Sequence, residues 1–92
     1  MKRMNIGYLF VAAALLTAPV SYASEDFYGT IESRPKGNAG IWVVGGRNLD
    51  VTDRTRFVEE YGPLSVGACV EVEIDGRVVK KIASEEKRKC AK

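Results

Sequence analysis

The sequence predicts an exported all-β domain in which five short strands close into a small barrel. Three observations lead to this prediction. Apolar residues alternate with a period of two, turn-forming residues separate the alternating segments, and two cysteines lie in the second half of the chain. The strands are expected to curl into a barrel, because a flat sheet of this size would leave its edges unpaired and its core uncovered.

The N-terminal segment is typical of a cleaved export signal. Lys2 and Arg3 provide a positive start, and an apolar run follows from Ile6 to Val20. A membrane-spanning helix needs about 20 apolar residues, so this run is too short to be a comfortable anchor. Ser21 and Ala23 are the small residues that a signal peptidase requires, and we expect cleavage after Ala23.

Cleavage divides the chain into a signal peptide, residues 1–23, and one mature domain, residues 24–92. The chain has 14 basic and 12 acidic residues, and two of the basic ones, Lys2 and Arg3, leave with the signal. The mature domain is therefore neutral. Nucleic-acid binding relies on excess basic charge, so we expect no nucleic-acid partner. We expect a periplasmic or secreted monomer with no membrane anchor after cleavage.

The first three strands are predicted over residues 27–32, 41–44 and 47–52. The turn formers Arg34-Pro35-Lys36-Gly37-Asn38 separate the first two, and Gly45-Gly46 separates the second and third. Residues 55–58 fit either a short extended piece or a single helical turn, which ends at Gly62-Pro63.

The clearest strand runs from Val66 to Ile74 and precedes a hairpin at Asp75-Gly76. Two registers are open for the returning strand, residues 77–83: a two-residue turn places Glu71 opposite Lys80, and a three-residue loop places Glu73 opposite Arg77. Alternation places Val66, Ala68, Val70, Val72 and Ile74 on the core face, and Cys69, Glu71, Glu73 and Asp75 on the solvent face.

Cys69 and Cys90 are expected to form a disulfide, because oxidised pairs persist outside the cytoplasm. The bond would close a loop of about 20 residues and stabilise the fold by about 3 kcal/mol. A domain of this size has a core that contributes only about 3–5 kcal/mol, so this tether matters.

The order and spacing of several short motifs resemble a family of small exported bacterial domains of unknown function. That resemblance implies an OB-like five-stranded barrel and a binding module. The sequence departs from ordinary OB-folds because residues 53–65 are too short, and too rich in Gly and Pro, for the usual helix after the third strand. The motifs are Tyr28-Gly29-Thr30-Ile31, Gly40-Ile41-Trp42-Val43-Val44-Gly45-Gly46, Thr55-x-Phe57, Gly67-x-x-Val70-x-Val72, Gly76 and Ile82.

We expect no catalysis and no cofactor. The chain contains no histidine, and both cysteines are assigned to the disulfide, so the usual general bases and nucleophiles are scarce.

Two groups of residues are candidates for binding sites. Trp42, Arg47 and Tyr61 could form one ligand-binding face, although Trp42 also suits the core. Glu71, Glu73 and Asp75 point the same way along one strand and could attract a divalent cation, although the same row suits a solvated face paired with lysine or arginine.

The predicted function is surface recognition of an envelope protein or a small ligand by a binding or accessory module. Two alternatives stay open. The first is an inhibitor of an envelope hydrolase, which would present a protruding loop such as Arg34 to Gly40. The second is a periplasmic protein that binds a divalent cation.

Overall fold

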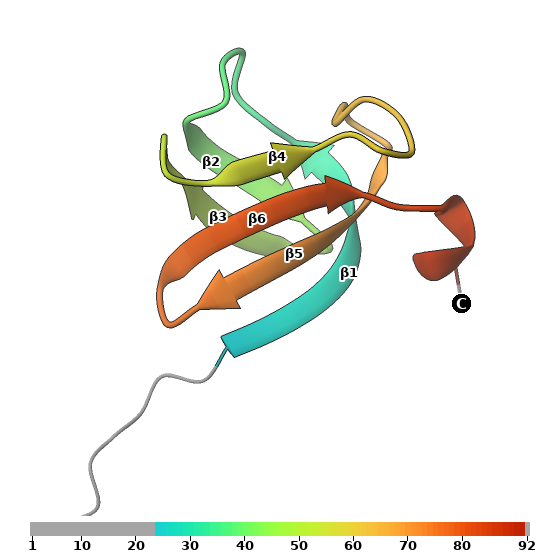
Figure 1. Cartoon of the computed structure of the whole chain (residues 1–92). Helices are drawn as coiled ribbons and strands as arrows, with labels where there is room; N and C mark the ends of the chain where they lie inside the picture. The colour runs from blue at the N-terminus through green and yellow to red at the C-terminus, as the bar shows by residue number, and fades with distance from the viewer. Residues whose placement is uncertain (1–23, 92) are drawn as a thin grey trace, which may run out of the picture.

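The computed structural model describes residues 24–91, which form one sheet of six strands and a short 3₁₀ helix (Figure 1). The predicted signal peptide, residues 1–23, lies outside the described residues. No helix in the described range is long and apolar enough to cross a membrane. The elements are β1 (Ser24–Ser33), β2 (Gly40–Val44), β3 (Arg47–Val51), β4 (Arg56–Val58), β5 (Cys69–Asp75), β6 (Val78–Ser84) and η1 (Lys87–Lys89).

The long strand β1 joins the two halves of the sheet, whose order is β3-β2-β1-β5-β6-β4. The N-terminal part of β1 pairs with β5, and its C-terminal part pairs with β2. The register shifts between Ile31 and Ser33, an irregularity that bends a strand. A Cβ atom at Gly29 would lie 3.0 Å from Val44 Cγ1 and 3.1 Å from the Gly45 backbone nitrogen. Glycine therefore lets the β2–β3 turn lie tightly against β1.

The sheet curls without being closed by strand pairing. In Figure 1, β2 and β3 lie behind β4, β5 and β6, and β3 also approaches β6. The outer strands are β3 and β4. The prediction of a closed five-stranded barrel is therefore wrong in strand number and in closure.

A turn at residues 52–55 explains this difference. The Thr55 backbone N–H donates to the Thr52 carbonyl (3.1 Å), and the Thr55 hydroxyl donates to the Val79 carbonyl (2.8 Å). The turn ends β3 and starts β4, which pairs in parallel with β6. Of the two alternatives for residues 55–58, the extended one is confirmed.

The core lies between the two halves of the curled sheet. Trp42 and Val44 point inward from β2, whereas Ile41 is exposed, which settles the ambiguous alternation of that strand. The buried cluster consists of Ile31, Trp42, Val44, Leu49, Val51, Leu64, Val70, Val72, Ile74, Val79 and Ile82. The predicted core face of β5 is thus confirmed at Val70, Val72 and Ile74.

The first part of the predicted fifth strand differs from the structure. The strand begins at Cys69, and Val66 lies before it with 62% of its surface exposed. Cys69 was expected on the solvent face, yet it is buried, since the chain beyond β6 returns to it.

The β5–β6 hairpin adopts neither of the two predicted registers. Asp75 pairs with Val78, so the loop residues are Gly76 and Arg77, and Gly76 has a φ of 67°. Glycine adopts this left-handed conformation without a steric penalty. A register shift then places Glu73 opposite Lys81.

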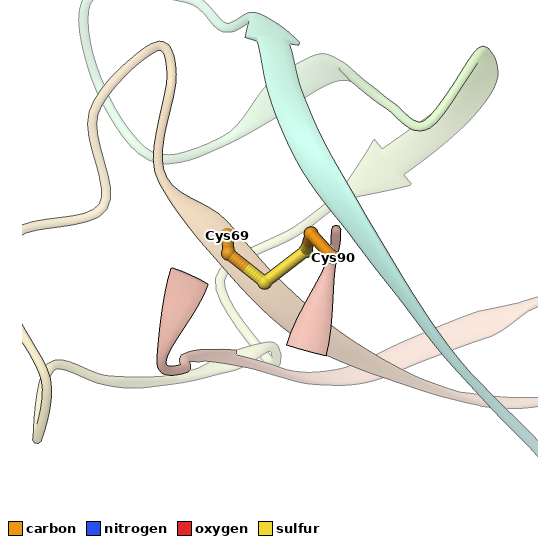
Figure 2. The surroundings of a disulfide bond; sticks show 2 residues. All are labelled: Cys69 and Cys90. Atoms are coloured by element: carbon orange, nitrogen blue, oxygen red, sulfur yellow. A yellow bond between two sulfur atoms is a disulfide. The ribbon is translucent and has the colours of Figure 1, made fainter. Parts of the chain in front are cut away.

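The predicted disulfide between Cys69 and Cys90 is confirmed, with Cα atoms 5.8 Å apart (Figure 2). Cys69 starts β5, and Cys90 follows η1. The Glu85 backbone N–H also donates to the Cys69 carbonyl (2.8 Å). The disulfide and this hydrogen bond together hold the C-terminal segment against the sheet.

Replacing both cysteines by serine is expected to lower the free energy of unfolding by about 3 kcal/mol, since the closed loop restricts the unfolded chain. Urea unfolding of the mature protein measures this difference. Reductant should destabilise the wild type equally and leave the double variant unchanged. A loss below about 0.5 kcal/mol would contradict the assigned role of the bond.

Candidate functional site

The structure does not bring the predicted ligand-binding residues Trp42, Arg47 and Tyr61 together in one site. Trp42 is completely buried. Its ring stacks on Phe57 with 5.7 Å between the centroids, and its Nε1–H donates to the Asn38 carbonyl (2.7 Å). The core alternative is therefore confirmed for Trp42, and the hypothesis of an exposed aromatic platform at this position is wrong.

Arg47 belongs to a separate surface cluster on the first strands. Its guanidinium donates to Glu25 at 2.8 Å and 3.4 Å and lies over the Phe27 ring, with Cζ 4.2 Å from the centroid. The hydrogen bond from Arg47 and its positive charge lower the pKa of Glu25, and the same hydrogen bond raises the pKa of Arg47. The charge of Arg47 is thus already matched within the chain.

The predicted cation site does not assemble. Within residues 24–91, no group of three or more His, Cys, Asp or Glu side chains is arranged to hold a metal ion. Glu71, Glu73 and Asp75 follow one another on the outer face of β5, where alternate residues are about 7 Å apart. Glu73 lies opposite Lys81, which agrees with the alternative of a mixed, solvated face.

A second site emerges where the chain leaves β1. The Arg34 side chain spans the β1–β2 loop, residues 34–39, and ties it to a distant part of the chain. Its guanidinium donates to the Leu64 carbonyl, to the Gly37 carbonyl (3.1 Å) and to Asn38 Oδ1 (2.8 Å). Its Cζ lies 4.1 Å from the centroid of the buried Trp42 ring. We call these contacts the Arg34 brace.

The segment on the other side of the brace, residues 59–67, is itself attached to the sheet. Glu59 Oε2 accepts a hydrogen bond from the Leu64 backbone N–H (3.0 Å), and the Ser84 hydroxyl accepts one from the Tyr61 N–H (2.9 Å). The Leu64 side chain is buried in the core. Figure 1 shows the β1–β2 loop extending beyond the sheet.

Tyr61 lines a groove beside this segment, with a volume of about 360 Å³. Two of the five large apolar side chains that are exposed in the described chain, Tyr61 and Val66, lie in its wall. Pro63 extends the same apolar wall, whereas Glu85 and Lys87 provide charges. Of the three predicted ligand-binding residues, only Tyr61 lines this groove.

Comparisons with protein-family models, with curated proteins and with solved structures give no match to the chain. The resemblance to exported OB-like domains accordingly stays a prediction.

Alternation and turn signals could not reveal the Arg34 brace. Arg34 and Leu64 are 30 residues apart in the chain, and an arginine beside a proline is an ordinary turn residue. The partner of its guanidinium is a backbone carbonyl, which carries no residue-specific signal. The brace therefore becomes visible only in the folded chain.

Replacing Arg34 by alanine is expected to lower the free energy of unfolding by about 1–3 kcal/mol, because charge-assisted hydrogen bonds at a half-buried site are lost. Arg34→Lys should recover only part of this loss, since lysine lacks the planar guanidinium that donates several hydrogen bonds and also lies over the Trp42 ring. Urea unfolding measures both variants. Equal stability of the wild type and Arg34→Ala would contradict the brace.

The Glu25–Arg47 pair predicts a pH dependence. The pKa of Glu25 is lower in the folded than in the unfolded chain, so the pair stabilises the fold above the ordinary value of 4.5. This contribution is lost as the pH falls through the lowered value. Glu25→Gln should therefore reduce the urea midpoint at pH 7, and the difference from the wild type should vanish in acid. Glu60→Gln, at an exposed site, is the control, and an unchanged difference in acid would refute this assignment.

Proposed function

We propose that the mature protein is a small exported recognition module that binds a protein partner through the β1–β2 loop and catalyses no reaction. The observation that carries this proposal is the Arg34 brace. Loops usually lose conformational freedom on binding, and a loop that is already fixed avoids much of that cost. A half-buried side chain that lies over the Trp42 ring thus prepares an exposed loop for binding.

The loop has the shape and exposure that recognition requires. Lys36, Gly37, Asn38 and Ala39 are exposed, and the chain bends at each of these four positions. The loop therefore ends in a compact tip, with the Lys36 side chain as its only charge. The tip is attached to the core, because the Trp42 Nε1–H donates to the Asn38 carbonyl.

The absence of ordinary catalytic groups supports binding without chemistry. The sequence contains no histidine, and the disulfide occupies both cysteines. The proposal retains the export signal over residues 1–23, so the partner is sought outside the cytoplasm. An inhibitor of an envelope hydrolase is the special case in which the tip enters an active site, and the protruding loop at residues 34–39 favours it as the second candidate.

An OB-like fold is part of the same proposal. Two features support it. The strand β1 bends and pairs with β2 in one half of the sheet and with β5 in the other, and only the four residues 52–55 separate β3 from β4. Counted as one interrupted strand, β3 and β4 reduce the six strands of the open sheet to five. That arrangement suits the partly open five-stranded barrel of OB-folds.

Site-specific photo-crosslinking in living cells tests the proposed function. A photoreactive amino acid at Lys36 should give one discrete adduct, whereas the same group at Lys80, an exposed residue of β6, should give none. Combining the probe at Lys36 with Arg34→Ala should reduce the adduct severalfold, because the loop is no longer held for binding. A hydrolase in the adduct would select the inhibitor.

Equal labelling from positions 36 and 80, or no adduct from a correctly exported protein, would overturn recognition through the loop. An adduct that is insensitive to Arg34→Ala would remove the role of the brace.

A further inference from the structure

We propose that the groove beside residues 59–67 binds a segment of the same partner in which an apolar side chain lies close to a carboxylate. This inference rests on the proposed function, since it assumes a protein partner. It starts from two neighbouring hollows that share part of their lining. The groove already described has a volume of about 360 Å³, and a second hollow of about 250 Å³ adjoins it.

The two hollows meet at Gly67, Cys69 and Lys87, which line both of them. The first has an apolar wall of Tyr61 and Val66, with 53% and 62% of their surfaces exposed. Burial of such side chains under an apolar group is favourable, so this end suits a hydrophobic residue of the partner.

The second hollow suits a negative charge. Its lining within the described chain is Thr30, Gly67, Cys69, Lys87, Cys90 and Ala91, of which Lys87 alone is charged. Glu85 lines the first hollow and not the second, so its carboxylate does not compete at this end. A ligand carboxylate is therefore best placed at the end that Lys87 shares with Cys90.

Lys87 differs from its two basic neighbours in η1. Arg88 pairs with Glu86 at 2.9 Å, and the Lys89 Nζ lies 5.4 Å from the centroid of the Tyr28 ring. Within residues 24–91, Lys87 makes no ion pair. The charge of Lys87 is thus available for a ligand, whereas a carboxylate already holds Arg88.

The disulfide fixes the wall that carries Lys87. The Cys90 backbone N–H donates to the Lys87 carbonyl (3.0 Å), and Cys90 is bonded to Cys69, which lines both hollows. Figure 2 shows this bond between β5 and the C-terminal segment. The backbone at the charged end therefore keeps its position relative to the apolar end, which fixes the spacing between the two ligand groups.

The test uses two capped peptides, acetyl-Phe-Gly-Glu-amide and acetyl-Phe-Gly-Gln-amide, and follows amide shifts of the ¹⁵N-labelled mature protein. Shifts are expected at residues 61–69 and 85–87. The Glu peptide should bind roughly twofold to fivefold more tightly than the Gln peptide at low salt, the range of one exposed ion pair. Lys87→Ala should abolish this preference, whereas the matched control Arg88→Ala should preserve it.

Equal affinities for the two peptides, a preference that survives Lys87→Ala, or no shifts at millimolar peptide would overturn the inference. The photo-crosslink at Lys36 separates this failure from failure of the proposed function. An adduct at Lys36 together with equal peptide affinities refutes only the carboxylate site. Absence of the adduct refutes the protein partner itself.

Discussion

The buried indole of Trp42 is the constraint on which the rest of the structure depends. Its ring stacks on Phe57 of β4 and so helps to hold the two halves of the curled sheet together. Its Nε1–H donates to the Asn38 carbonyl, and the Arg34 guanidinium lies over its ring; both residues belong to the β1–β2 loop. A single core residue therefore connects the packing of the domain to the conformation of its most prominent loop, and loss of core packing would release the loop as well.

The disulfide has a parallel role at the C-terminal end. The hydrophobic core of a small domain provides little stabilisation, so a disulfide contributes a large share of the free energy of unfolding. The bond from Cys69 to Cys90 also covers the start of β5 and holds η1 beside the groove of Tyr61 and Val66. Stability and the candidate binding surface thus depend on the same covalent link.

Local patterns in the sequence predict the strands to within three residues at either end, and they predict the cysteine pair, because alternation and compartment chemistry are local signals. They do not decide whether Trp42 faces the core or the solvent, since Ile41 and Val43 are as apolar as Trp42 and Val44. They miss the open sheet, the hairpin register and the Arg34 brace. Each of these depends on contacts between distant segments, such as Arg34 with Leu64 or Thr55 with Val79. The predicted cation-binding residues Glu71, Glu73 and Asp75 do not form a metal-binding group in the described chain. Alternate residues of one strand are about 7 Å apart, so a second element would have to supply further ligands.

The central claim is that the Arg34 brace fixes the β1–β2 loop before any partner binds. Backbone ¹⁵N relaxation of the free mature protein tests it most directly, with the order parameters of residues 36–39 compared with those of β5. We predict order parameters of about 0.85, as in rigid strands, for the loop as well as for β5. Values below about 0.6 in the loop, with β5 still rigid, would show that the loop is mobile and would contradict a preformed recognition surface.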